Sequence, residues 1–390
     1  MLGSTVLLKI ITSSLLFISL IGVAKPTNKI QQIEALFENS AKNPTVPGIN
    51  AAIADTSGVI WAKGYGFADI ENNVSMTNQH KMRIGSVAKL ITVAGMMRLF
   101  EQGKLSLDAP ISQYVPVWPK QHPAISLRQL AAHTSGVRHY KNNAEFLLNQ
   151  HFADTAASLM LFKNDDLLFT PGTGHKYSTF AFSLIAAAME GADKKRDFKQ
   201  IIHQEVFEPL AMENSVFDDQ AVIIPHRQRP YIARDGQLFN APQSDHSYKY
   251  AGGGFIATPS DISRFAVAHT EQSYLTMPSL KAMFSQSSLT NDEKVPFGIG
   301  WMIGFDNYKN RSYYKDNQKA QKLMDSFDNV AMHSGGSNGG TTMLILCRDH
   351  QRSVTVVKNV DGEYSADVFL LALEALGMFH TNDNTKSSSL

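Results

Sequence analysis

Cysteine is almost absent from this 390-residue chain, which contains Cys347 alone. A single cysteine excludes an internal disulfide, and its place in the apolar run TTMLILC favours a small buried side chain over a reactive thiol. Net charge is nearly absent too, because 36 lysines and arginines against 35 aspartates and glutamates give +1. The chain therefore has no overall positive electrostatic field that would attract nucleic acid or an acidic surface. P-loops, zinc-ligand spacings and His-Glu-x-x-His are also missing, so we expect no metal or cofactor.

A long uncharged apolar run lies at the N-terminus. After Lys9, residues 10–24 carry no charge, and small residues at 22 and 24 precede Lys25. This pattern predicts a signal peptide, residues 1–24, that is cleaved after about Ala24 and directs export, in a bacterium to the periplasm. The run is short for a membrane-spanning helix. The alternative is a retained membrane anchor, and only in that case do we expect membrane contact.

Hydrophobic periodicity predicts an α+β fold. Residues 29–43 place apolar side chains on one helical face, residues 47–69 read as two strands joined by a turn, and about 86–212 is helical with loops. Strand-like patterns return near the C-terminal end, before a last helix over 365–379; they cover 297–305, 329–336, 341–347 and 353–360. We therefore expect one antiparallel sheet built from both chain ends, with flanking helices and an inserted, mostly helical lobe.

The predicted organisation is one domain over residues 25–378. Residues 306–329 are polar and without clear period, so we expect a long mobile loop there, and the polar tail 379–390 is expected to be disordered. Within the domain, the sheet part is expected at about 29–80 and 290–378, and the helical lobe at about 81–289.

A serine and a lysine three residues apart begin the helical segment 86–101. Apolar residues cover most of the circumference of this segment, which predicts a buried helix and makes Lys89 unusual. At this spacing Ser86 and Lys89 share one face. Burial disfavours the charged amine, so Lys89 can take the proton of the Ser86 hydroxyl and make it a nucleophile. The alternative is a helix-capping serine beside a solvated lysine.

Two later stretches supply partners for this pair. Tyr177, in YSTFAF, lies at a loop-to-helix junction, where a phenol can relay the proton between Ser86 and Lys89. The stretch HSGGSNGG, residues 333–340, lies between two predicted strands, and its glycines allow close approach of a substrate to the backbone. An edge strand there can pair with a peptide-like substrate, and the N–H groups of Ser86 and Gly336 can form an oxyanion hole.

Together, RIGSVAKLIT, YST and HSGG resemble the three motifs of the penicillin-recognising serine hydrolases, the family of class C β-lactamases, penicillin-binding proteins and related carboxypeptidases and esterases. The stretches SLRQLAAHTSGVRHY, TPGTGHKYSTFAFSLIAAAME and AGGGFIATPSDISRFA extend the resemblance, over about 30–378, to mitochondrial serine β-lactamase-like proteins and their bacterial relatives. The resemblance implies that Ser86 is the acylated nucleophile, Lys89 the general base and Tyr177 the proton relay. The residues that it implies for oxyanion and substrate binding are Ser86, Thr179, His333, Ser334, Gly335 and Gly336.

Two positions depart from the family pattern. Where classical β-lactamases end the second motif in asparagine and begin the third with lysine, this chain has Thr179 and His333. A neutral histidine offers less positive charge to a substrate carboxylate. Protonation of His333 would then strengthen the binding of anionic substrates below about pH 6.5. The substrate class stays open among short peptides, D-amino-acid peptides and small esters.

Two alternatives compete with this interpretation. Residues 335–339 match the Gly-x-Ser-x-Gly nucleophile elbow, but a predicted strand follows where the elbow needs a helix. A binding or self-assembling protein that keeps the fold without catalysis is the second alternative. The intact set of Ser86, Lys89 and Tyr177 favours an exported serine hydrolase that acts on amide or ester bonds of a small-molecule or peptide substrate. The sequence does not predict an oligomeric state.

Overall fold

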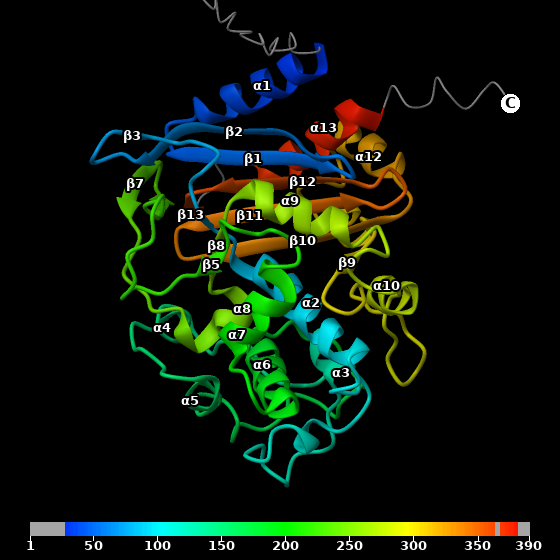
Figure 1. The fold of residues 1–390 in the computed structure, drawn as a ribbon. Coiled ribbons are helices and arrows are strands. Elements are labelled where there is room, and N and C mark those ends of the chain that lie inside the picture. Colours follow the sequence, from blue (N-terminus) through cyan, green and yellow to red (C-terminus); the bar gives the residue numbers. More distant parts are fainter. Residues whose placement is uncertain (1–27, 363–366, 381–390) are drawn as a thin grey trace, which may run out of the picture.

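The computed structural model describes residues 28–362 and 367–380. The predicted signal peptide and all but the first two residues of the predicted tail lie outside them. The main sheet has the strand order β3-β2-β1-β12-β11-β10-β9, with every neighbouring pair antiparallel (Figure 1). Its strands are β1 (Gly48–Asp55), β2 (Gly58–Asp69), β3 (Val74–Ser75), β9 (Met302–Ile303), β10 (Val330–Ser337), β11 (Gly340–Cys347) and β12 (Arg352–Lys358). Because β1 pairs with β12, the sheet joins both chain ends, which confirms the predicted α+β architecture.

Strand β11 shows why the sheet is apolar on both faces. Met343, Ile345 and Cys347 belong to one core cluster, and the intervening Leu344 and Leu346 belong to another. Helices α1 (Asn28–Ala41) and α13 (Val368–His380) contribute to the first cluster, and α9 (Pro259–Ala268) contributes to the second. A strand that is covered on both faces reads as a continuous hydrophobic run. Cys347 is 1% exposed, which confirms its prediction as a buried small side chain.

The helical lobe is packed around two buried helices, α2 (Ala88–Glu101) and α6 (Phe180–Asp193). Both belong to the same core cluster as the α9 face of the sheet, so lobe and sheet share one interior. The smaller helices around them are α3 (Leu127–Ala131), α4 (Asn143–Phe146), α5 (Thr155–Leu159), α7 (Phe198–Ile202), α8 (Tyr250–Gly253) and α10 (Met277–Phe284). Two small sheets complete the fold: β4 (Met82–Arg83), β8 (Phe255–Ala257) and β5 (Val216–Phe217); and β13 (Val360–Gly362), β6 (Tyr231–Arg234) and β7 (Gln237–Asn240).

The expectation of a mobile loop at 306–329 is wrong. The segment forms α11 (Asp306–Lys309) and α12 (Gln318–Asp325). Its aromatic residues Tyr308 and Tyr314 are buried and lie 4.2 and 4.9 Å, between ring centroids, from Phe369 of α13. A few large side chains thus anchor a segment whose average composition is polar.

The predicted strand over 297–305 is also mostly wrong, because only β9 is extended there. Gly300 has φ +80° and Gly304 has φ +72°, a backbone region that a regular strand does not use. The apolar residues of this stretch, such as Ile299 and Trp301, are nevertheless buried in the core. A buried tight turn can therefore have the same apolar sequence pattern as a strand.

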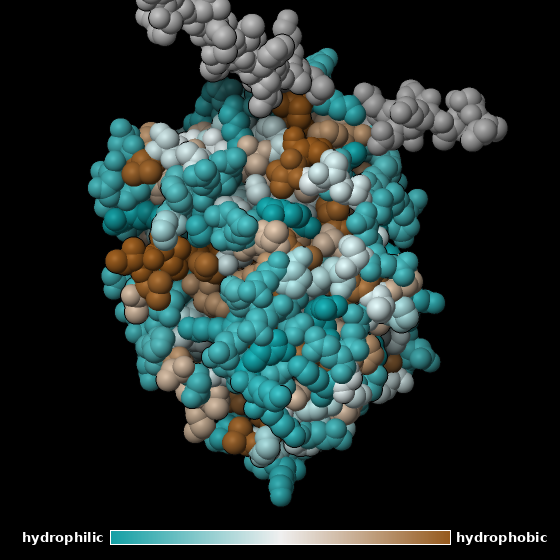
Figure 2. All heavy atoms as spheres, in the orientation of Figure 1, coloured by the Kyte–Doolittle hydropathy of each residue, from teal (hydrophilic) through white to brown (hydrophobic). Residues whose placement is uncertain are grey.

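The face of the molecule drawn in Figure 2 is largely hydrophilic, with apolar side chains gathered at its left margin, below the place of β7 in Figure 1, and near the top, by α13. Exposed apolar residues of the described chain include Val222, Ile223 and Phe239. Within residues 28–362 and 367–380, no helix combines the length and apolarity that crossing a bilayer requires.

Candidate active site

Ser86 lies in a 3₁₀ turn, Gly85–Val87, that leads directly into α2, and Lys89 lies in the first turn of that helix. Ser86 is half-buried, whereas Lys89 is fully buried, as its apolar helix predicts. Gly85 permits the turn because its φ is +50° and because a Cβ atom there would lie 2.6 Å from the carbonyl oxygen of Gly336. The turn therefore seats Ser86 against β10.

The amine of Lys89 has three polar neighbours. Its Nζ donates to Ser86 Oγ at 3.1 Å, to Thr179 Oγ1 at 3.1 Å and to the carbonyl oxygen of Gly252 at 2.6 Å. Burial, and then the nearby charge of Lys249, holds the pKa of Lys89 well below its ordinary value. A larger fraction of this amine is therefore neutral near pH 7 and able to accept the Ser86 proton.

Tyr177 completes the predicted group. Its ring centroid lies 4.9 Å from Lys89 Nζ, and its hydroxyl is near enough to the Ser86 side chain for that side chain to affect its pKa. The His133 ring lies 4.3 Å from the Tyr177 ring between centroids, and its Nδ1 accepts the backbone N–H of Ser178 at 3.2 Å. Burial raises the pKa of Tyr177, and the nearby Ser86 side chain opposes this increase. The phenol is thus protonated in the free protein, which suits a relay better than a base.

The third motif, residues 333–336, lies on β10 and packs tightly on the serine turn. A Cβ atom on Gly335 would lie 2.0 Å from the carbonyl oxygen of Ile84 and 3.2 Å from the backbone nitrogen of Ser86. Strand β10 pairs with β9 through only two residue pairs. Past those pairs, no strand in the described part of the chain covers this edge, so it is available to an extended substrate.

A cavity of about 370 Å³ lies over Ser86. Among the predicted site residues, Tyr177, Thr179 and Gly336 line it together with Ser86. The expectation that the whole third motif lines the pocket needs correction, because the lining excludes three of its residues: His333, Ser334 and Gly335. The physical reason is the close packing of this strand on the serine turn, which leaves only the end of the motif facing the cavity.

His333 does not provide the charge expected of it. The side chain is 3% exposed, its Nδ1 lies 2.6 Å from the carbonyl oxygen of Ser334, and its Nε2 has no hydrogen-bond partner among the described residues. Burial, and then the charge of Lys89, lowers the pKa of His333 to about 3. The expectation that this imidazole becomes protonated and strengthens anion binding below about pH 6.5 is therefore wrong.

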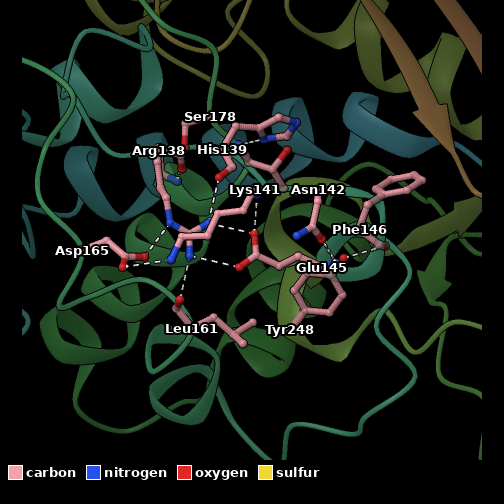
Figure 3. Close-up of polar contacts among 12 residues, drawn as sticks. Arg138, His139, Lys141, Asn142, Glu145, Phe146, Leu161, Asp165, Ser178 and Tyr248 are labelled. Carbon is pink, nitrogen blue, oxygen red and sulfur yellow. Dashed lines mark hydrogen bonds and ion pairs between the residues drawn. The ribbon is translucent and has the colours of Figure 1, made fainter.

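Arg138 holds one wall of the cavity, the segment 139–146 (Figure 3). Its guanidinium donates to Asp165 at 2.5 Å, to both carboxylate oxygens of Glu145 at 2.8 and 3.0 Å, and to the carbonyl oxygen of Leu161 at 2.8 Å. Arg138 is 8% exposed, so these are nearly desolvated, charge-assisted contacts. The wall is thereby fixed to the helical lobe.

Replacing Arg138 by methionine should lower the free energy of unfolding toward the lower end of the ~3–5 kcal/mol found for broken buried ion pairs, since Asp165 remains partly exposed. Equilibrium urea unfolding measures this change. The double variant Arg138→Met, Glu145→Gln is the matched control, because it removes the carboxylate left unpaired and should recover part of the loss. A single variant as stable as the wild type would contradict this role.

Lys249 and Gly252 are among the cavity residues that sequence reasoning missed. Lys249 ends a 3₁₀ turn, Ser247–Lys249, and Gly252 belongs to α8, which follows directly. Both line the cavity, and Gly252 accepts a hydrogen bond from Lys89. The available signal was the lysine placed just before the glycine segment AGGGF. That segment is close-packed, because a Cβ atom on Gly252 would lie 2.5 Å from the side chain of Thr179.

Comparison with known proteins finds similarity to β-lactamase-like proteins, in agreement with the resemblance of the sequence motifs. A family model described as Beta-lactamase matches residues 33–377. The serine beta-lactamase-like protein LACTB, mitochondrial, of Homo sapiens is 25% identical over 80% of this chain and 71% of its own length. Penicillin-binding protein 4* of Bacillus subtilis is 23% identical over 88% of this chain and 75% of its own length.

Solved structures share the fold at lower identity. The D-amino acid amidase from Ochrobactrum anthropi SV3, complexed with L-phenylalanine amide, has a TM-score of 0.73 and 18% identity, with 93% of this chain and 100% of that chain covered. The octameric penicillin-binding protein homologue from Pyrococcus abyssi has a TM-score of 0.71 and 20% identity, with 90% and 77% covered. The family match spans the sheet, the lobe and the cavity between them, and this chain therefore belongs to the β-lactamase family of serine hydrolases.

Proposed function

We propose that this protein hydrolyses amide or ester bonds through an acyl-enzyme formed on Ser86. The observation that carries the proposal is the fully buried Lys89 amine, with its lowered pKa, 3.1 Å from the Ser86 hydroxyl. A buried lysine without a carboxylate partner is costly to a fold. Its position beside a reachable serine is explained by chemistry that needs a neutral amine.

The proposed reaction has two steps. Lys89 Nζ takes the Ser86 proton while Oγ attacks the carbonyl carbon, and the resulting oxyanion accepts hydrogen bonds from the N–H groups of Ser86 and Gly336. The tetrahedral intermediate collapses, and the leaving amine or alkoxide receives the proton through Tyr177. Water then attacks the acyl-enzyme with Lys89 as base, which releases the acid and returns the proton to Ser86.

The proposed substrates are short peptides, D-amino-acid peptides or amides, and small esters. The solved relatives support this range, since their names include a D-stereospecific amidohydrolase, a D-amino acid amidase and a hydrolase with acyltransferase activity. The uncovered edge of β10 favours an extended substrate that pairs with the strand.

A panel of nitrophenyl esters and of L- and D-amino-acid anilides tests the activity. We expect measurable turnover of at least one class by the wild type and a loss of at least about a thousandfold in kcat/KM for Ser86→Ala. Ser326→Ala, which changes an exposed serine next to α12, is the matched control and should retain full activity. Equal rates for wild type and Ser86→Ala would overturn the proposal.

We also propose that the protein is exported, on the strength of the uncharged run over residues 10–24. N-terminal sequencing of the protein recovered from its native cells tests this proposal. A chain that begins near Lys25 supports export with cleavage, whereas a chain that begins at Met1 and is recovered from the cytoplasm contradicts export.

A further inference from the structure

A second lysine, Lys249, lines the same cavity as Ser86 and transfers no proton in the mechanism above. The residue is 2% exposed. Its Nζ donates to the carbonyl oxygen of Phe146 at 3.1 Å and lies 4.2, 5.1 and 5.5 Å from the ring centroids of Phe146, Tyr248 and Tyr140. One wall of the cavity thus ends in an amine surrounded by aromatic rings.

The hydrogen bonds of this amine are incomplete. An ammonium has three N–H donors, and Lys249 has one acceptor among the described residues, which it shares with the hydroxyl of Tyr248. Among the described residues, no carboxylate oxygen lies within 4.0 Å of Lys249 Nζ, the distance limit for an ion pair. Buried lysines that serve only stability are normally paired, because an uncompensated charge is costly. The partner of Lys249 is therefore expected to come from outside the chain.

We propose that Lys249 binds a carboxylate group of the substrate and so makes this hydrolase selective for acyl compounds that carry a negative charge near the scissile bond. The inference rests on the proposed function. A carboxylate in the cavity would provide the missing acceptors and compensate the buried charge. His333 is neutral and does not line the cavity, whereas Lys249, at the end of the turn before α8, does line it and can take this role.

The charge state of Lys249 makes the selectivity depend on pH. Burial, and then the charge of Arg83, lowers the pKa of Lys249 to about 7, while Asp218 opposes the decrease. A bound carboxylate favours the protonated amine, so anion binding should weaken as the pH rises through about 7. The other titratable or charged groups around this amine are Lys89, His139, Tyr140, His246 and Tyr248. Of these, the histidines have pKa values lowered to about 4 and the phenols have raised pKa values, which leaves Lys89 as the second group to control.

Matched substrates separate the two lysines. The 4-nitrophenyl hemiesters of succinate, glutarate and adipate carry a carboxylate, and their methyl esters are neutral analogues with the same scissile bond. Because Lys89 acts on both members of a pair, the ratio of their kcat/KM values isolates charge recognition. We expect Lys249→Gln to lower this ratio by about 10- to 100-fold at pH 6.5, with Lys249→Arg closer to wild type. We also expect the wild-type ratio to fall between pH 6 and 8.5, and the ratio of Lys249→Gln to stay constant.

A ratio that Lys249→Gln leaves unchanged, while the neutral ester is still hydrolysed, would overturn the inference and spare the proposed function. Calorimetric titration of the wild type with hexanoate and hexanamide gives a second test that needs neither turnover nor a variant. Hexanoate should bind more tightly and take up a proton at pH 8, detected as a buffer-dependent binding enthalpy. Equal binding of the two ligands, or binding without proton uptake, would contradict a carboxylate site at Lys249.

Discussion

Replacing Lys89 by methionine should lower kcat/KM for a neutral ester by about 10²–10⁴-fold, the usual contribution of a positioned general base. Methionine keeps most of the length of the side chain but cannot accept a proton. Removal of a buried amine also removes its desolvation cost, which offsets the loss of its bonds to Ser86, Thr179 and Gly252. The variant should therefore remain folded, and steady-state kinetics with a parallel thermal melt measures both properties.

The same lysine determines the direction of the pH dependence. The pKa of Lys89 lies well below its ordinary value, and in the proposed mechanism the neutral amine is the active form. For a neutral ester, kcat/KM of the wild type should therefore rise with pH through that lowered pKa and then level off. The residual rate of Lys89→Met should lack this rise. An unchanged rate and profile in the variant would show that another group accepts the proton.

Gly335→Ala should lower kcat by about 10²–10³-fold, comparable to the loss of an oxyanion-hole donor. The added methyl group would lie 2.0 Å from the carbonyl oxygen of Ile84, which is backbone and cannot rotate away. Strand β10 and the serine turn must then separate, which should disrupt the oxyanion hole that we propose for the N–H groups of Ser86 and Gly336. Single-turnover kinetics of acyl-enzyme formation detects this loss directly.

Gly336→Ala provides the control for folding. A Cβ atom at Gly336 meets no heavy atom within 4 Å, so this variant should unfold at the same urea concentration as the wild type. Gly335→Ala should be less stable by about 1–3 kcal/mol, the usual cost of overpacking. Wild-type activity and stability in Gly335→Ala would contradict the tight contact between the strand and the turn.

The arrangement of the proposed catalytic residues could be predicted from the sequence because its signals are local. The spacing of Ser86 and Lys89 on an apolar helix implies both a shared face and burial, and the structure has both. The positions of Tyr177 and of the glycine-rich stretch 333–340 beside Ser86 could be predicted because both lie where predicted helices or strands begin and end. Lys249 could not be predicted in the same way, since its significance arises only when α4 and the turn before α8 meet across the cavity.

The incorrect predictions share one physical cause: the composition of a segment does not determine how its side chains pack in the folded protein. The segment 306–329 is polar on average, yet Tyr308 and Tyr314 bind it to α13. The segment 297–305 is apolar, yet its glycines turn the backbone away from strand geometry. His333 looks like a titratable group in the sequence, and burial against the serine turn keeps it neutral.

Intact-protein mass spectrometry after exposure to a fluorophosphonate tests directly whether Ser86 is an activated nucleophile, because this reagent phosphonylates an activated serine with loss of fluoride. We expect one adduct per wild-type chain, mapped to Ser86, no adduct on Ser86→Ala, and much slower labelling of Lys89→Met. An unmodified wild type over a wide range of pH and reagent concentration would contradict an activated Ser86. It would favour a protein that uses the β-lactamase fold for binding or assembly.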